Sequence, residues 1–406
     1  MTARRPAGPA ARAWQRLATQ VDTRSCELVA LDGRLDGARL QAALDHVVAV
    51  HPLLHARWDG VGWHAPDAPL RVAAEDLDGP WDAASVVARC WDEGDPHATQ
   101  VRWIRAADRD GLAIQVPHAR TDARSGAQVV ADLGDAYGAL GRGEAPAARP
   151  DDAPWEPALL LPSRAEDRVA ALRRILSDLA APAGWTRDPA LPRGRSRARV
   201  HDLGPEAWAR VKARAREDGT TPHVRLCLAT ARAFGTTRLL DLASVRHLAT
   251  ADVGARADVL VVPWVLHVPG AGHAPAAAAA VAAQVGSVKD GVARAELARL
   301  GLYESVADWI PVDLAIRATT RLVVKADVVH TNPGPVYVPL DAFGDVGIAD
   351  FVNFPQLVPP ARAGVVWTTF RGRLRMIALW DDVAWPAGID DACAAVRDDL
   401  GLDGIG

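Results

Sequence analysis

The stretch that decides the fold is LAIQVPHARTDARSG, which spans residues 112–126. Residues 112–116 are almost all apolar, which is typical of a buried β-strand. His118 follows this strand after one proline, and Asp122 comes four residues later. Apolar residues then recur at helical spacing over residues 127–140. The segment therefore predicts a strand, a short loop that carries His118, and an amphipathic helix.

The N-terminal part of the chain repeats this alternation of strand and helix. Residues 26–31 are apolar enough for a strand, and Asp36 is a suitable N-cap for a helix over residues 37–50. His51 and Pro52 end that helix.

The C-terminal part carries a similar set of elements. The pattern predicts helices over residues 206–218 and 223–234, and strands over 199–203, 365–370 and 374–380, the last two joined at Gly372. Alternating strands and helices in both halves predict an α/β protein.

Three segments resemble condensation domains and the wider chloramphenicol-acetyltransferase-like superfamily. Residues 117–123, PHARTDA, resemble its HHxxxDG signature, with Pro117 at the first histidine and Ala123 at the glycine. Residues 31–58 resemble the opening of these enzymes, and residues 215–234 resemble their GxTxxxxLxAAxAxAL stretch. The resemblance runs in order from about residue 15 to 400.

The resemblance implies two chloramphenicol-acetyltransferase-like lobes, each a mixed sheet flanked by helices, that meet at a central channel. We expect an N-terminal lobe over residues 1–160, a linker over 161–195 and a C-terminal lobe over 196–406.

The resemblance also implies an activity, because the second histidine of the signature is the general base of acyl transfer. His118 is that histidine, and a neutral imidazole suits the removal of a proton near neutral pH. Asp122 is implied as a structural anchor that pairs with an arginine, for which Arg57 is one candidate. The expected reaction moves an acyl group from a coenzyme A or carrier-protein thioester to a hydroxyl or amine in natural-product biosynthesis.

An acyl transfer passes through an oxyanion, which needs fixed hydrogen-bond donors. Residues 321–324 and 328–334 match a strand of the resembling enzymes that ends in a small polar residue. Thr331 and Asn332 therefore lie where these enzymes present such a donor. A simple turn at the end of a strand explains the same residues equally well.

The two departures from the signature keep other activities open. Pro117 removes a backbone N–H, and Ala123 replaces a residue that is free to adopt positive φ. The alternatives are a cyclase or lyase, in which His118 moves a proton without acyl transfer, and a non-catalytic scaffold that binds a carrier protein.

Composition narrows the partners and cofactors. The chain has 406 residues and a net charge of −4, without a basic block, so we expect no nucleic acid partner. Its longest apolar run is too short for a bilayer, so we expect no membrane partner. No GxGxxG motif, P-loop or GxSxG elbow is present, so we expect no tightly bound cofactor and no serine hydrolase. No carrier-domain signature appears, so a carrier protein would be a separate partner.

The expectation for metals is also negative. Four cysteines without CxxC spacing indicate neither a zinc site nor disulfides, and they favour a reducing cytoplasm. His46, His51 and His55 are closely spaced, but Pro52 interrupts the helix between the last two. A shared ligand face is therefore not expected, and the sequence predicts no metal site.

Overall fold

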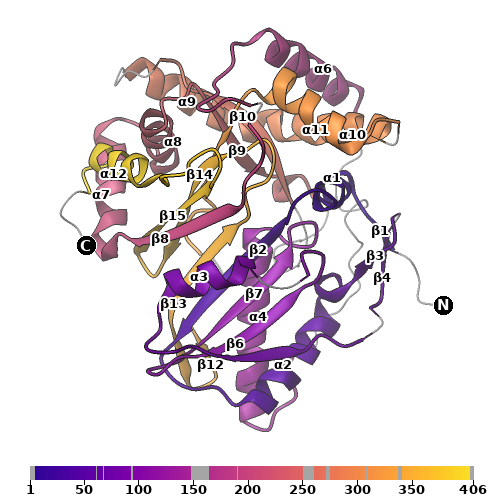
Figure 1. The fold of residues 1–406 in the computed structure, drawn as a ribbon, viewed down its shortest axis with the longest axis vertical. Coiled ribbons are helices and arrows are strands. Elements are labelled where there is room, and N and C mark those ends of the chain that lie inside the picture. The colour runs from indigo at the N-terminus through magenta and orange to yellow at the C-terminus, as the bar shows by residue number, and fades with distance from the viewer. Residues whose placement is uncertain are drawn as a thin grey trace. The chain divides into compact units, whose positions relative to one another are not determined.

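The structure is a computed structural model that describes residues 5–60, 62–66, 68–92, 95–147, 164–189, 191–249, 260–270, 275–307, 309–336 and 341–402. Contacts between residues divide the chain into two compact units. The first unit comprises Met1–Leu161, Arg246–Leu260 and Val336–Gln356, and the second comprises Pro162–Val245, Val261–Pro335 and Leu357–Gly406. Both units combine a mixed sheet with helices (Figure 1), so the predicted α/β class is confirmed.

The first unit is built on a six-stranded sheet. Its strand order is β12 (Ala342–Phe343), β13 (Val346–Pro355), β2 (Arg24–Leu31), β7 (Asp110–Pro117), β6 (Gln100–Arg105) and β5 (Val72–Asp76). Neighbouring strands are antiparallel except β5 and β6, which are parallel. Every residue of β2 and β7 is buried, as expected for the centre of a sheet that is covered on both faces.

Helices α2 (Gly37–Val50), α3 (Ala83–Asp92) and α4 (Ala123–Gly141) pack against this sheet. Helix α2 has the bounds that the sequence predicts. It begins where the Asp36 carboxylate accepts a hydrogen bond of 2.8 Å from the backbone N–H of Arg39. Such a cap satisfies one of the four free N–H groups at a helix start.

A small subdomain of the first unit packs beside the end of β7. It contains α1 (Pro9–Ala18), the 3₁₀ helix η1 (Pro52–His55) and a three-stranded sheet in the order β1 (Arg5–Pro6), β4 (Gly62–His64) and β3 (Arg57–Trp58). Its core consists of Ala7, Ala11, Leu53, Ala56, Trp63 and Ala119, with Trp14 and Trp58 packed against it. The residue after His118 is therefore part of this core.

The second unit is built on another six-stranded sheet. Its strand order is β10 (Val261–His267), β9 (Arg238–Ser244), β11 (Val328–Thr331), β14 (Ala363–Phe370), β15 (Arg373–Asp381) and β8 (Ser196–Asp202). Strand β11 is parallel to both of its neighbours, and the other pairs are antiparallel. Its helices are α6 (Ala165–Ala180), α7 (Gly204–Glu217), α8 (Pro222–Ala233), α9 (Pro275–Ser287), α10 (Ala293–Ala307), α11 (Val312–Ala318) and α12 (Asp390–Asp399).

The predicted hairpin near the C-terminus is confirmed as β14 and β15. Arg371 and Gly372 form its turn with φ values of 47° and 78°. Two successive residues at positive φ are typical of a type I′ turn, whose twist matches that of the two strands.

The strand predicted over residues 321–324 is wrong. These residues belong to a π-helical segment, η4 (Thr319–Val324), that continues helix α11. The helix ends at Lys325, which has a φ of 48° and whose N–H donates to the carbonyl of Thr320 at 2.9 Å. The segment is helical because it continues the helix of α11, although its apolar residues alone would favour a strand.

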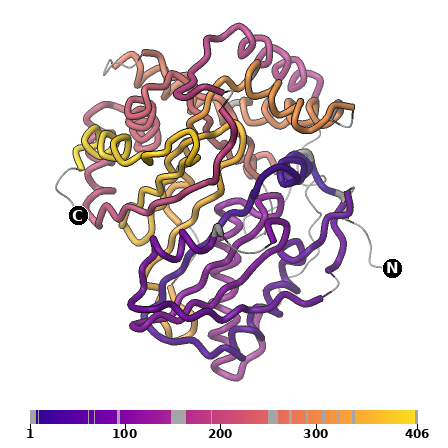
Figure 2. The backbone as a smooth tube through the Cα atoms, in the orientation of Figure 1, coloured from indigo at the N-terminus to yellow at the C-terminus, as the bar shows by residue number. Residues whose placement is uncertain are grey.

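The compact units also differ from the lobes that the sequence predicts. Strand β13 pairs with β2 from Ile348 opposite Leu31 to Pro355 opposite Ser25, which places part of the C-terminal half in the first unit. Figure 2 shows this segment in orange beside the indigo strand. Helix α6 lies within the predicted linker, where the sequence itself indicates a helix near residues 164–179, and it packs against α10 within the second unit. Residues 148–163 lie outside the described residues.

Within the described parts of the chain, no helix combines the length and the apolar composition that a membrane span requires.

Candidate active site

His118 lies immediately after β7, and its backbone is fixed on both sides. Its N–H donates to the carbonyl of Thr23 at 2.9 Å, and the carbonyl of Pro117 accepts from the N–H of Arg120 at 2.9 Å. Pro117 is the last residue of β7, and the pairing with β6 already ends at Gln115. The proline therefore interrupts no hydrogen bond between β7 and β6, which explains how the chain tolerates it.

The imidazole of His118 is buried, with 5% of the residue exposed. The indole of Trp14, from helix α1, stacks on it with a centroid distance of 4.2 Å and an interplanar angle of 4°. Ring atom Nδ1 is buried and makes no hydrogen bond with any described residue.

Burial lowers the pKa of His118 below its usual 6.5. The backbone of His118 and Thr121 and the charge of Asp122 act in the opposite direction but do not cancel the effect of burial. The ring is consequently neutral at pH 7 and able to take up a proton.

Asp122 caps helix α4 and uses both of its carboxylate oxygens. Oδ1 accepts hydrogen bonds from the backbone N–H groups of Arg124 at 3.1 Å and Ser125 at 2.9 Å, and Oδ2 accepts from that of Leu260 at 3.0 Å. Nη2 of Arg246 donates to Oδ1 at 2.7 Å. Burial raises the pKa of this carboxyl, but Arg246 and the hydrogen bonds lower it further than burial raises it. Asp122 is therefore a charged anchor for the loop, and it carries no transferable proton at pH 7.

The arginine that pairs with Asp122 is Arg246, in the 3₁₀ helix η2 (Arg246–Leu248), whereas the sequence suggested Arg57. Arg246 also donates to the hydroxyl of Ser125 at 2.6 Å. It lies 124 residues from Asp122, and no motif in the sequence links the two.

Ala123 is the first residue of helix α4. Among the described residues other than glycine, only Lys325 and Arg371 have positive φ, so Ala123 carries no strain of that kind. Helix α4 does require glycine at other positions: a Cβ atom at Gly126 would lie 1.8 Å from Oε1 of Glu27, and one at Gly134 would lie 2.7 Å from the carbonyl oxygen of Ala342. No pattern in the sequence links these glycines to their neighbours.

Arg120 holds the loop that follows His118. Its guanidinium donates to the hydroxyl of Thr99 and to the carbonyl of His97, both at 2.9 Å. Burial lowers the pKa of Arg120 to about 10, although Asp95 opposes the shift, so the side chain is still charged at neutral pH.

The two predicted oxyanion residues lie in the second unit. Thr331 is the last residue of β11 and is 8% exposed. The Asn332 side-chain oxygen accepts a hydrogen bond of 3.0 Å from the N–H of Gly334, whose φ is 82°. Asn332 thus closes the turn at the end of the strand, and the oxyanion role of both residues stays a prediction.

The three closely spaced histidines have separate neighbours. His46 approaches the carbonyl of Ala147 at 3.1 Å, and His55 approaches that of Ala68 at 2.7 Å. His51 pairs with the carboxylate of Asp132 at 2.6 Å. Each ring is thus directed to a different group.

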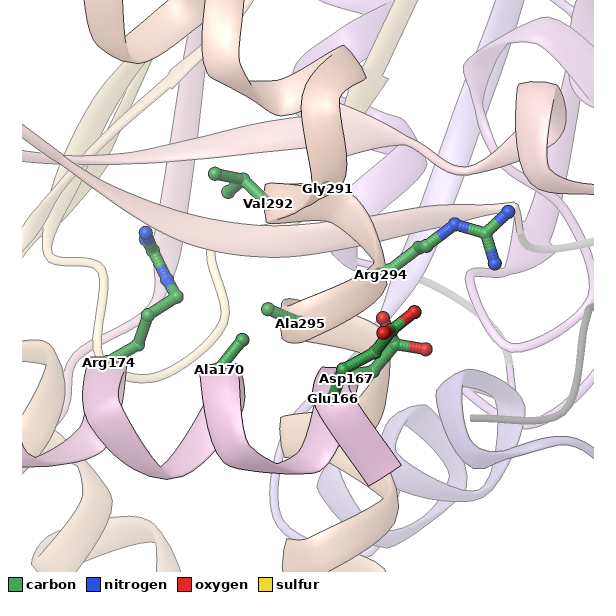
Figure 3. Close-up of a pocket in the computed structure, with 8 residues that line it drawn as sticks. All are labelled: Glu166, Asp167, Ala170, Arg174, Gly291, Val292, Arg294 and Ala295. Carbon is green, nitrogen blue, oxygen red and sulfur yellow. The ribbon is translucent and has the colours of Figure 1, made fainter. Parts of the chain in front are cut away.

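An open pocket of the second unit lies between α6 and α10 (Figure 3). Its lining includes the carboxylates of Glu166 and Asp167 and the guanidinium groups of Arg174 and Arg294. Arg174 also forms an ion pair with Glu296 at 2.6 Å. The pocket contains none of the predicted site residues.

Comparison with known proteins gives matches in structure only. No protein-family model matches the chain, and no curated protein matches its sequence. The first condensation domain of the CDA synthetase aligns with a TM-score of 0.74 and 16% identity, over 100% of this chain and 97% of that one.

Two further solved structures have the same fold. The trichothecene 15-O-acetyltransferase TRI3 from Fusarium sporotrichioides aligns with a TM-score of 0.76 and 10% identity, over 98% of this chain and 94% of that one. The epimerization domain from the third module of tyrocidine synthetase B aligns with a TM-score of 0.67 and 12% identity, over 99% and 97%. The chain therefore has the fold of condensation domains and chloramphenicol-acetyltransferase-like enzymes, as the sequence predicts.

Proposed function

We propose that the protein is an acyltransferase of the condensation type, with His118 as its general base. The observation that carries this proposal is a buried imidazole, kept neutral by its surroundings, at the end of a central strand of a condensation-type fold. The carboxylate four residues later is held by Arg246 and three backbone N–H groups, which fixes the loop that carries the base.

In the proposed reaction, His118 takes the proton of an attacking hydroxyl or amine. The oxygen or nitrogen bonds to the carbonyl carbon of a thioester, and the carbon–sulfur bond then breaks. The imidazolium returns its proton to the departing thiolate, so an ester or amide and a free thiol result. Thr331 and Asn332 are the candidate donors to the oxyanion that forms between these steps.

The proposed acyl donor is a thioester, carried by coenzyme A or by the phosphopantetheine of a separate acyl or peptidyl carrier protein. Two of the similar structures are a condensation domain and an epimerization domain of synthetases, which favours a carrier protein. The acceptor is a small molecule with a hydroxyl or amine, as the name of the trichothecene O-acetyltransferase suggests.

The test is transfer from a panel of acyl-coenzyme A and acyl-carrier-protein donors to alcohol and amine acceptors, with products measured by mass spectrometry. We expect His118→Ala to lower turnover by about 10²–10⁴-fold, the usual contribution of a positioned base. His46→Ala is the matched control, because His46 lies on helix α2, outside the site, and its ring hydrogen-bonds to the carbonyl of Ala147.

Two outcomes oppose the proposal. Full activity in the His118→Ala variant would show that His118 is not the general base. Failure of every donor, when wild-type protein still converts a thioester-bound substrate without acyl release, indicates a cyclase, a lyase or an epimerase instead.

Proton transfer without acyl transfer, as in a cyclase, a lyase or an epimerase, also has specific support. Pro117 stands where the signature has its first histidine, and the fold is shared with an epimerization domain. His118 would then move a proton on a bound intermediate without forming a new acyl bond. If the wild-type protein turns over none of these substrates but binds a carrier protein, the scaffold function is supported instead.

A further inference from the structure

Four side chains with metal-binding atoms converge within the second unit. They are His223 and Cys227 of α8, Asp241 of β9 and His330 of β11. His223 and Cys227 are four residues apart, which places them on one face of the helix. Asp241 and His330 each follow a residue of the register pair Leu240 and Val329, so they lie side by side on neighbouring strands.

The distances between these side chains form a closed ring of four contacts. Cys227 Sγ lies 3.6 Å from Nε2 of His223 and 3.4 Å from Nδ1 of His330. Asp241 completes the ring, with Oδ2 3.1 Å from Nε2 of His223 and Oδ1 3.4 Å from Nδ1 of His330. One ligand atom from each residue can be chosen so that all four lie within 4.8 Å of one another.

These distances suit a zinc ion. Zinc binds nitrogen and carboxylate oxygen at about 2.0–2.2 Å and sulfur at about 2.3 Å, so the edges of its tetrahedron measure about 3.3–3.6 Å. The four contacts of the ring run from 3.1 to 3.6 Å. The remaining separations among the four ligand atoms reach at most 4.8 Å, so the side chains would have to draw together by about 1 Å to complete the coordination.

Hydrogen bonds alone do not account for this arrangement. Each of the two ring nitrogens faces both the sulfur of Cys227 and an oxygen of Asp241. A nitrogen carries at most one proton, so it can donate well to only one of these neighbours. A cation at the centre would satisfy all four atoms at once.

Burial and charge point to the same ligand. Cys227 and His330 are fully buried, Asp241 is 1% exposed, and the side chain of His223 is 24% exposed. A divalent cation with one thiolate, one carboxylate and two neutral imidazoles has no net charge, which removes the cost of an unpaired charge in the interior. Sulfur and nitrogen donors favour zinc over magnesium or calcium.

We propose that His223, Cys227, Asp241 and His330 bind one Zn²⁺ ion in a tetrahedral structural site. Four protein ligands leave no open position, so the ion ties α8 to β9 and β11 and does not act on a substrate. His330 directly precedes Thr331, so the bound ion would hold β11 in place next to that residue. The sequence predicts no metal site, because the cysteines lack CxxC spacing and Pro52 separates His51 from His55. The i, i+4 pair His223 and Cys227 belongs to neither pattern.

The experiment uses the full-length protein, with zinc content measured by mass spectrometry and Co²⁺ as a spectroscopic substitute. We expect one zinc per chain, and in the cobalt protein a thiolate-to-cobalt charge-transfer band with the visible bands of tetrahedral Co²⁺. Cys227→Ser removes the charge-transfer band. His223→Ala weakens Zn²⁺ binding by at least about 100-fold, because even residues that merely support zinc ligands contribute 10–100-fold.

The matched control is Cys393→Ser, a buried free cysteine of the same unit that lies outside the cluster. It should keep the zinc content and the cobalt spectrum of the wild type. The proposal fails if the wild type binds no stoichiometric Zn²⁺ when titrated, or if its cobalt spectrum lacks the thiolate band. It also fails if Cys393→Ser loses the metal as Cys227→Ser does. The wild-type spectrum decides the question even if a variant does not fold.

Discussion

Arg246 donates a hydrogen bond of 2.7 Å to the carboxylate of Asp122, across 124 residues of sequence. Both side chains are almost completely buried, at 7% and 2% exposure. Removing one partner of such a pair leaves the other charge buried without its counter-charge. Removing both partners leaves no unpaired charge in the interior.

We therefore expect Arg246→Met to lower the free energy of unfolding by about 3–5 kcal/mol. Asp122→Asn keeps a good N-cap for α4, so the double variant Asp122→Asn with Arg246→Met should lose less than the sum of the single changes. Urea unfolding of the four proteins measures this coupling.

The control for this set of four proteins is Arg109→Met, because Arg109 forms an ion pair with Asp108, whose side chain is exposed. The midpoint of urea unfolding of that variant should equal that of the wild type, since exposed ion pairs contribute little to the free energy of unfolding. Strict additivity between the changes at 122 and 246 would contradict the anchor role of the pair.

The parts of the fold that the sequence predicts are those set by local patterns. Helix α2 begins at Asp36 and buries Leu40, Leu44 and Val47 because apolar spacing and a capping residue agree. Helix α4 likewise begins after Asp122. Such elements need no information about distant segments.

The parts that the sequence does not predict depend on contacts between distant segments. The pairing of β13 with β2, the ion pair of Asp122 with Arg246 and the meeting of Cys227 with His330 each join residues with no pattern in common. The strand prediction for residues 321–324 is wrong for a related reason. These apolar residues are suitable for a strand, but in the structure they belong to the η4 segment, which continues helix α11.

Trp14 sets the environment of the proposed base, because its indole stacks on His118 and keeps water from one face of the ring. Burial is the largest cause of the lowered pKa of His118, so Trp14→Ala should raise that pKa toward 6.5. A general base is inactive when protonated, so wild-type activity should persist below pH 6.5 and be lost at lower pH, and the variant should lose it at higher pH.

NMR titration of the His118 ring measures this shift directly, and the pH profile of kcat/KM measures its effect on turnover. Trp58→Ala is the matched control, since Trp58 packs against the same small core but its ring contact is with Trp63. An unchanged His118 titration in Trp14→Ala would show that the indole does not control the pKa.

Gly126 permits α4 to approach β2, because a Cβ atom there would lie 1.8 Å from Oε1 of Glu27. We expect Gly126→Ala to lower the free energy of unfolding by about 1–3 kcal/mol or more, as other overpacked sites do. Gly286→Ala, in helix α9, is the matched control, because its Cβ would meet no atom within 4 Å. That change should raise stability by about 0.5–1 kcal/mol through helix propensity. Chemical denaturation compares the two, and equal effects would disprove the steric argument.

Glu27 makes the stability of the first unit depend on pH. Burial raises the pKa of its carboxyl well above 4.5, although the hydrogen bond from Nδ2 of Asn353 at 2.5 Å opposes the shift. The folded protein therefore holds this proton at pH values where the unfolded chain has already lost it. Its stability then falls as pH rises from 4.5 toward the folded pKa.

Glu27→Gln removes the ionisable group and keeps an oxygen that can accept from Asn353. The variant should match the wild type near pH 4.5 and become increasingly more stable than it as the pH rises above 4.5, as measured by thermal unfolding over a series of pH values. Glu75→Gln is the control, because Glu75 pairs with Arg89 and Arg102 and its replacement breaks favourable ion pairs. That variant should gain no stability with rising pH. A constant difference between Glu27→Gln and the wild type over this range would mean that Glu27 is ionised in the folded protein, and that Gly126 packs against a carboxylate.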